Sequence, residues 1–321
     1  FQTGIAPESA VNIAVDLVKR SGRLQEAKFV NAVLRRALEQ PKPWSDAPES
    51  VLPPVLFRRW RKRYSAAELT QLAAALLTQP EFTFRAERGF EPGELAAEAV
   101  PAFGEFRFFR ARSAAQLLES AALRDGRIYI QDPATSLAPS LPDFTGVGSV
   151  LDLCAAPGGK SLMLGERLAG DGVLVAADRS ERRQRQTAEN FRRRGLNYRV
   201  VTADPAELTG EFDVVLADVP CSNTGVYRRR PDVLWRFRPE ELEKITALQR
   251  RILGEAARLT APGGQLVCST CSIEPEENAL QVEAFLNEHP GFERVCERQL
   301  LPSAEADGAY ACLLRRSSSS I

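Results

Sequence analysis

VLDLCAAPGGK, at residues 150–160, is the stretch that decides the fold. It reads as a short apolar strand, Val150–Leu153, followed by a glycine-containing turn that opens a helix at 161–168. The alternation continues to the end of the chain. We expect further strands at 173–177, 198–201, 212–217, 265–269, 291–296 and 310–314, and helices at 179–194, 240–259 and 276–287. Alternating strands and helices predict an α/β fold with a doubly wound, mostly parallel, Rossmann-like sheet.

The residues before this sheet are organised differently. Two helices are expected over 9–39 and two more over 54–77, while 81–130 is mixed. The mixed part predicts short strands at 81–85, 106–109 and 128–130, with helical pieces at 91–99 and 113–119. We therefore expect a helical piece (1–42), a linker (43–53), a small α/β extension (54–140), the sheet domain (141–316) and a disordered tail (317–321). The chain starts at Phe1 and is soon helical, so the beginning of the helical piece is expected to be missing.

The composition of the 321 residues is that of an ordinary globular protein, with 44% hydrophobic and 26% charged residues and no net charge. No apolar run reaches the roughly 20 residues that span a bilayer, and no signal peptide is visible. Six cysteines and one histidine make neither a zinc site nor a secreted disulfide framework, so no metal is expected. Cysteines that stay as free thiols are typical of the reducing cytoplasm, so we expect a cytoplasmic protein. Arginine clusters at 58–63, 182–199 and 228–238 are either solvated helix faces or contacts to a phosphate backbone. Nothing demands more than a monomer.

The turn after the first strand is a candidate cofactor loop. Ligands of doubly wound sheets bind beyond the carboxyl ends of the strands, and glycine lets the backbone approach a ligand closely. The loop lacks the G-x-G-x-x-G pattern of nicotinamide enzymes and the upstream glycine of a P-loop. Its candidate cofactor-binding residues are Cys154, Ala155, Ala156, Pro157, Gly158, Gly159 and Lys160.

Three carboxylates follow successive strands of the expected sheet. Asp178 could accept both hydroxyls of a ribose, Asp204 lies where an adenine edge is expected, and Asp218 ends the fourth strand. One such residue alone is usually a turn or helix cap. Three in register with a glycine loop favour an adenosyl ligand without phosphates, which is S-adenosylmethionine.

Two cysteines stand where the active site of such a sheet is expected. Cys221 follows the fourth strand in DVPCSNTG, and Cys271 follows the fifth in CSTCSI. The other four cysteines are read as small core residues, the usual role of an isolated thiol. Their positions are Cys154, Cys268, Cys296 and Cys312.

Paired thiols beside a methyl donor suit methylation of cytosine at carbon 5. Carbon 5 is a poor nucleophile, and thiolate addition at carbon 6 makes it enamine-like, so that it can attack a sulfonium methyl group. The carbon 5 proton and the thiol must then leave. Because His289 is remote in sequence, we expect activation from Asp218, which could share a proton with ring nitrogen 3, and from Lys160 and nearby arginines, which favour a thiolate.

Three strings together resemble the NOL1/NOP2/Sun family of RNA 5-methylcytosine methyltransferases: CAAPGGK, DVPCSNTG and the segment from Ser269 to Asn278. GRIYIQDPA at 126–134 is also similar to the family's segment before the catalytic domain. The resemblance implies a class I methyltransferase fold. It also implies that Cys271 is the nucleophile and that Cys221 helps to release the methylated RNA. Residues 154–160 with Asp178, Asp204 and Asp218 would line the cofactor and base pocket.

The helical piece carries a finer resemblance. AVNIAVDL at 10–17 and KFVNAVLRR at 28–36 look like the second half of a NusB-like RNA-binding domain. A NusB-like domain ahead of this catalytic domain is similar to the bacterial Sun/Fmu branch, the ribosomal RNA small subunit methyltransferases of type B. This implies small-subunit (16S) ribosomal RNA as substrate and a place in rRNA processing.

The chain departs from the family in two segments and leaves alternatives open. Phe84–Glu87 replaces a common Arg-Val-Asn segment, and Asp307–Tyr310 replaces Asp-Gly-Phe-Phe, so contacts from both strands are uncertain on sequence grounds. Amino-group methylation is disfavoured because Cys221 stands where an aromatic residue would be. DNA cytosine methylation, another RNA such as tRNA, and a non-catalytic ribosome-assembly factor remain alternatives.

Overall fold

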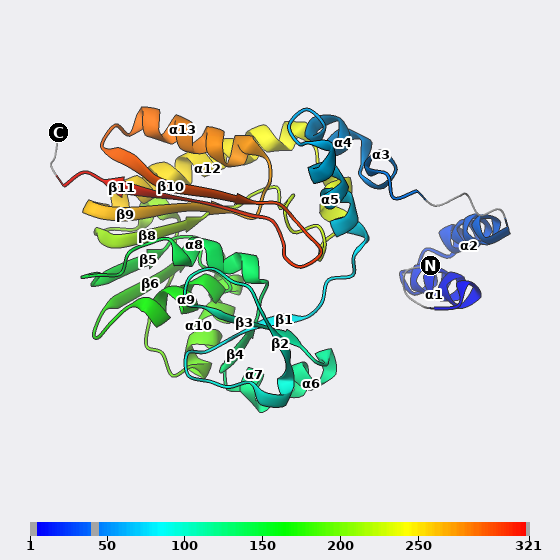
Figure 1. Cartoon of the computed structure of the whole chain (residues 1–321), viewed down its shortest axis with the longest axis horizontal. Helices are drawn as coiled ribbons and strands as arrows, with labels where there is room; N and C mark the ends of the chain where they lie inside the picture. Colours follow the sequence, from blue (N-terminus) through cyan, green and yellow to red (C-terminus); the bar gives the residue numbers. More distant parts are fainter. Residues whose placement is uncertain (1–4, 40–44, 319–321) are drawn as a thin grey trace. The chain divides into compact units, whose positions relative to one another are not determined.

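The computed structural model describes residues 5–39 and 45–318 (Figure 1). The chain forms two compact units, one ending at Asp46 and one starting at Ala47. Parts of the expected linker (43–44) and tail (319–321) lie outside the described residues, whereas Ser317 makes backbone hydrogen bonds with Gly263 and Gly291. No helix in the described ranges combines the length and apolar character needed to cross a membrane.

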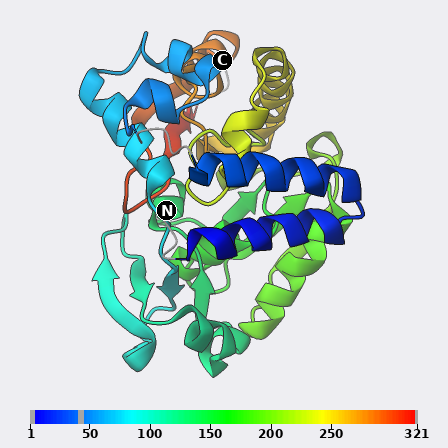
Figure 2. The same cartoon turned by 90° about the vertical axis from the view of Figure 1, so that its right-hand side faces the viewer.

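The first unit contains the two expected helices, α1 (Pro7–Arg20) and α2 (Leu24–Glu39), which lie side by side in Figure 2. Gly22, at a φ of +81°, makes the tight turn between them. Their contact buries Val11, Val15 and Ala27, one small apolar seam at helical spacing.

The second unit is built on a seven-stranded sheet with the order β10-β11-β9-β8-β5-β6-β7. The five strands from β9 to β7 are parallel, and β11 runs antiparallel to both β9 and β10. The strands are β5 (Ser149–Asp152), β6 (Val173–Asp178), β7 (Arg199–Thr202), β8 (Phe212–Asp218), β9 (Thr260–Thr270), β10 (Phe292–Leu300) and β11 (Ala309–Arg316). The expected Rossmann-like sheet is confirmed, with every expected strand present.

Helices cover both faces of this sheet because side chains alternate along each strand. Val150, Leu174 and Val214 belong to the core under one set of helices, and their neighbours Leu151, Val175 and Val215 belong to the core under the other. Figure 1 shows the two layers. They are α8 (Leu137–Ser140), α9 (Gly159–Arg167) and α10 (Glu181–Arg193) on one face, and α12 (Pro239–Leu259) and α13 (Ala279–Glu288) on the other.

The extension before the sheet forms a small antiparallel sheet with the order β2-β3-β1-β4. Its strands are β1 (Thr83–Ala86), β2 (Ala96–Val100), β3 (Arg107–Ala111) and β4 (Ile128–Ile130), and its helices are α6 (Ala114–Glu119) and α7 (Ala121–Arg124). The predicted helical piece at 91–99 is wrong: only η1 (Gly93–Leu95) is helical, and Ala96–Val100 pairs with β3. Alanine and glutamate favour helix intrinsically, but pairing with a neighbouring strand overrides that weak preference.

Two further helices pack against the loop between β8 and α12, and this loop contains a third. They are α4 (Pro54–Trp60), α5 (Ala66–Leu77) and the unpredicted α11 (Asp232–Arg236), and a turn of helix, α3 (Pro48–Val51), lies in the expected linker. Trp60, Leu72, Tyr227 and Phe237 share one buried cluster. The segments 52–76 and 227–242 therefore form one core, which extends to Ile273 beside the fifth parallel strand.

Candidate active site

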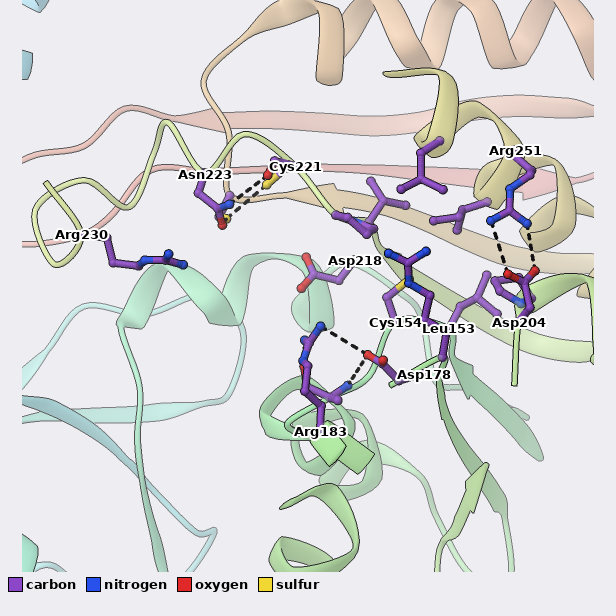
Figure 3. Close-up of a pocket in the computed structure, with 18 residues that line it drawn as sticks. Leu153, Cys154, Asp178, Arg183, Asp204, Asp218, Cys221, Asn223, Arg230 and Arg251 are labelled. Atoms are coloured by element: carbon purple, nitrogen blue, oxygen red, sulfur yellow. Dashed lines mark hydrogen bonds and ion pairs between the residues drawn. The ribbon is translucent and has the colours of Figure 1, made fainter. Parts of the chain in front are cut away.

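A cleft of about 560 Å³ opens at the carboxyl ends of the parallel strands (Figure 3). This is the edge where doubly wound sheets bind ligands. The cleft brings together seven of the predicted site residues: Cys154, Ala156, Asp178, Asp204, Asp218, Cys221 and Cys271. The other predicted residues, Ala155, Pro157, Gly158, Gly159 and Lys160, lie behind or beside this lining in the loop and first turn of α9.

The glycine loop is shaped by close backbone approach. Gly158 has a φ of +94°, and a Cβ there would lie 2.9 Å from Thr187 Cγ2 on α10. A Cβ on Gly159 would lie 3.0 Å from Gln131 Nε2. Side chains of α10 also hold the loop, because Asn190 Nδ2 donates to Pro157 O at 2.8 Å. Glycine is required here for packing of loop against helix as well as for the turn.

Asp178 and Asp204 lie at one end of the cleft. Asp178 is buried and accepts Ser180 N–H at 2.8 Å and Ala156 N–H at 3.3 Å, one on each carboxylate oxygen. Asp204 pairs with Arg251 at 2.9 Å, and this hydrogen bond lowers the pKa of the carboxyl. Figure 3 shows Arg183 beside Asp178 and Arg251 beside Asp204.

The chemistry of this end fits an adenosyl group. Each Asp178 oxygen has accepted one backbone N–H and retains a lone pair for a vicinal hydroxyl. Apolar side chains form a wall for a flat base: Leu153, Pro205, Leu248 and Ile252. Cys154 lines the same end, and burial strongly raises the pKa of its thiol, which keeps it protonated and unreactive.

Lys160 and Asp218 form an ion pair in the middle of the site, with 2.6 Å between Nζ and Oδ2. The other oxygen of Asp218 accepts Ser269 Oγ–H at 2.5 Å. Burial alone would lower the pKa of Lys160, but the charge of Asp218 and its hydrogen bond outweigh burial, and the net pKa is raised. Lys160 is therefore a cation, and it also interacts electrostatically with Cys271.

The two cysteines meet, with 3.3 Å between the Cys221 and Cys271 sulfurs. Register explains the meeting: Asp218 on β8 pairs with Ser269 on β9, so the loops that follow begin side by side. Asn223, at a φ of +61°, accepts Cys271 Sγ–H at 3.1 Å through Oδ1. The hydrogen bond to Cys271 and burial raise the pKa of Cys221 well above its usual value, so Cys221 keeps its proton.

Several residues of the site were not assigned a role from the sequence. Asn223 contacts a cysteine directly, and Glu274, Glu277 and Asn278 are buried beneath the Cys271 loop. Asn278 accepts Thr270 Oγ–H at 2.6 Å and donates to Ser272 O at 2.9 Å. A sequence signal was available: three polar residues, Glu274, Glu277 and Asn278, follow the second cysteine within one short acidic segment.

The first departure from the family pattern also has a structural role. Arg85 on β1 is buried and forms an ion pair with Glu166 on α9 at 2.5 Å. Arg194 binds the same carboxylate at 3.1 Å. Strand β1 therefore stabilises α9, the helix that follows the cofactor loop. At the second departure, Tyr310 is the second residue of β11 and pairs with Thr270, directly before Cys271.

Comparison with known proteins gives concordant matches. Residues 134–309 match the family model described as 16S rRNA methyltransferase RsmB/F, and residues 1–39 match the NusB family. "Probable ribosomal RNA small subunit methyltransferase B" of Bacillus subtilis is 31% identical over 97% of this chain and 79% of that protein. Ribosomal RNA small subunit methyltransferase B of Vibrio cholerae is 40% identical over 60% of this chain and 47% of that protein, about half its length. The crystal structure of PH0851 has a TM-score of 0.80 at 25% identity, over 98% of this chain and 78% of that one.

Proposed function

The chain belongs to the 16S rRNA methyltransferase RsmB/F family, and from that premise we propose that it methylates carbon 5 of a cytosine in small-subunit ribosomal RNA. The observation that carries the proposal is the pair of sulfurs, 3.3 Å apart, in the cofactor cleft. Its cofactor is S-adenosylmethionine, which supplies the methyl group. Asp178 would accept hydrogen bonds from the ribose hydroxyls of the cofactor. Asp204 and the apolar wall would lie against its adenine.

Cys271 is the proposed nucleophile. As a thiolate it forms a bond from Sγ to carbon 6 of the cytosine, which gives carbon 5 the electron density to accept the methyl group. Lys160 supports this role, because its ammonium interacts electrostatically with Cys271. Asp218 lies between the cysteine end and the adenosyl end in Figure 3, where it could bind nitrogen 3 of the base.

Cys221 is proposed to act in release. Methyl transfer to carbon 5 would break the bond between the methyl group and the sulfonium and leave S-adenosylhomocysteine. The carbon 5 proton then leaves to a base, the bond between Cys271 Sγ and carbon 6 breaks with its electron pair going to the sulfur, and the ring double bond returns. The thiol of Cys221 faces the departing sulfur and retains its proton. A proton donor in that place stabilises a leaving thiolate.

The test is methyl transfer from labelled S-adenosylmethionine to deproteinised small-subunit RNA. Cys271→Ala should lose methylation and form no adduct, whereas Cys221→Ala should accumulate a covalent protein–RNA adduct. Cys296→Ala, a half-buried cysteine on β10, is the matched control and should behave like wild type. If Cys271→Ala still methylates, the assignment of attack is wrong. If tRNA is methylated in preference to ribosomal RNA, the substrate assignment is wrong.

A further inference from the structure

Glu277 lies between the loops that carry the two cysteines, in the short helix η4 (Pro275–Glu277). It is 2% exposed and therefore almost wholly buried. Its Oε1 accepts Ser222 N–H at 2.7 Å, and its Oε2 accepts Ser222 Oγ–H at 2.5 Å. Ser222 is the residue after Cys221.

The same carboxylate binds the other cysteine loop. Oε2 accepts the hydroxyl of Ser272, the residue after Cys271. Gln249 on α12 donates to Oε1 at 3.1 Å and also to Pro220 O at 2.9 Å, directly before Cys221. One buried side chain thus receives hydrogen bonds from the neighbours of both sulfurs and from the helix behind them.

Burying the Glu277 carboxylate costs free energy, because a charged group loses its hydration. Among the described ion pairs, none includes Glu277, so hydrogen bonds alone offset the burial of its charge. Burial raises the pKa of Glu277, and its hydrogen bonds with Ser222 and Ser272 oppose that shift. A structural link alone could be made by apolar packing at lower cost.

We propose that Glu277 is a positioning residue that sets the separation of the two sulfurs, and thereby the transfer from attack by Cys271 to release assisted by Cys221. Glu277 touches neither sulfur in the described contacts and acts through Ser222 and Ser272. The catalytic consequence rests on the proposed function, whereas the positioning itself does not.

Contacts that do not involve Glu277 also join the two loops, so a variant at this position is informative. Gly225 N–H donates to Cys271 O at 2.8 Å, and Ser222 and Ser272 have their hydroxyl oxygens 3.1 Å apart. Loss of Glu277 should therefore loosen the sulfur pair without separating the loops.

The first readout needs no RNA. Phenylarsine oxide bridges two close thiols: two As–S bonds form, and the arsenic-bound oxygen leaves as water with both thiol protons. Its bridging of Cys221 and Cys271 can be measured by titration and by protection of both thiols from alkylation. We expect Glu277→Ala to weaken bridging by about 10- to 100-fold, as loss of a supporting hydrogen bond does at a metal site. Glu277→Gln, whose amide oxygen can still accept Ser222 N–H, should restore part of the affinity.

Glu276→Gln is the matched control, because Glu276 lies in the same turn but contacts Arg59 and Arg63 instead. It should bridge like wild type. Wild-type bridging by Glu277→Ala, or failure of wild type to bridge, would overturn the positioning role.

The second readout is turnover on ribosomal RNA. Glu277→Ala should lower kcat by about 100-fold, the scale of a misplacement of roughly 1 Å, with little change in KM and with accumulation of the covalent adduct. A variant that is merely less stable would lose adduct and turnover together, which would contradict the proposal. If wild type forms no adduct at all, the proposed function fails, and the arsenical result still decides the positioning role.

Discussion

The buried carboxyl of Asp152 should make the stability of this molecule depend on pH. Asp152 ends β5 directly before the cofactor loop and is wholly buried. Its Oδ2 accepts Ser161 Oγ–H at 2.6 Å, while Oδ1 has no partner among the described protein groups. Burial raises the pKa of Asp152 to about 7, and the negative charge of Asp218 adds to the rise. Asp152 is therefore protonated in the folded chain under conditions in which it ionises in the unfolded chain.

The sign of the effect follows. Because the pKa of Asp152 is higher in the folded chain than in the unfolded chain, protonated Asp152 contributes fully to stability below the unfolded pKa of 3.8. This contribution is lost as pH rises towards about 7. Between pH 5 and pH 8 wild type should lose about 3 kcal/mol more unfolding free energy than Asp152→Asn, because about 1.4 kcal/mol is lost per pH unit until the pH reaches the folded pKa of about 7. Urea unfolding at the two pH values measures the difference. Asp143→Asn is the control, because the Asp143 carboxyl is exposed and its pKa is lowered. Parallel pH profiles for wild type and Asp152→Asn would contradict the prediction.

In the proposed chemistry, Asp218 binds nitrogen 3 of the cytosine and so activates the ring for attack by the thiolate. Asp218→Asn removes the charge that pairs with Lys160 and leaves the ammonium without its partner. We expect adduct formation to slow by on the order of 100-fold, the lower range for loss of a general acid or base. Single-turnover trapping at saturating cofactor measures this rate.

Asp204→Asn is the comparison for that experiment. It changes a carboxylate at the end of the same cleft that is proposed to hold the adenosyl group, where Asp204 pairs with Arg251. It should weaken cofactor affinity and leave the saturated rate of adduct formation unchanged. Near-normal turnover of Asp218→Asn would remove Asp218 from the mechanism.

At the scale of elements, helix α4 and the turn after it, at 61–64, hold in place the loop that carries Cys271, the proposed nucleophile. Glu274 is wholly buried three residues after Cys271 and accepts Trp60 Nε1–H at 2.7 Å. Arg59 and Arg63 on the same side bind the other oxygen of Glu274 at 2.9 and 3.1 Å. Tyr64 adds a hydrogen bond to Ile273 O at 2.8 Å. The extension before the sheet is therefore part of the active-site support.

Trp60→Phe tests this link, because it keeps an aromatic ring and removes one donor to a buried charge. We expect a loss of about 1.5–3 kcal/mol in unfolding free energy, the usual cost for a hydrogen bond to a charged group. Denaturant unfolding measures it. Trp235→Phe, at a tryptophan that is 61% exposed, should change stability by less than about 0.5 kcal/mol. Equal effects of the two substitutions would show that the bond to Glu274 contributes nothing.

The elements also show which parts of this molecule were predictable from sequence. Parallel strands are buried on both faces and read as continuous apolar runs, so β5, β6 and β8 were identified directly. Strand β2 was not, because its three central residues are exposed and it depends on β3 for pairing. The meeting of Cys221 and Cys271 followed from neighbouring strand ends. The role of Glu277 did not, because it depends on how η4 turns back between two loops, and no spacing rule encodes that turn.

At the scale of the whole molecule, the two units have separate cores and different contents. The first unit buries only Val11, Val15 and Ala27 among the described residues and exposes larger apolar side chains such as Phe29. The second unit contains both sheets and every residue that lines the cleft. Folding of the cleft should therefore not require the first unit.

The first unit is expected to contribute to RNA binding instead. It matches the NusB family, and residues 5–39 carry six cationic and four anionic side chains. A chain of residues 47–321 should bind S-adenosylmethionine with a Kd within about twofold of the whole chain, because its affinity depends on local contacts in the cleft. Its KM for ribosomal RNA should rise, and the difference should shrink at high salt, because contacts to phosphates weaken as salt rises. Calorimetry with the cofactor and methylation kinetics at two salt concentrations measure both quantities. Loss of cofactor binding by the shortened chain would mean that the first unit stabilises the cleft, and an unchanged KM would mean that the second unit alone recognises the RNA.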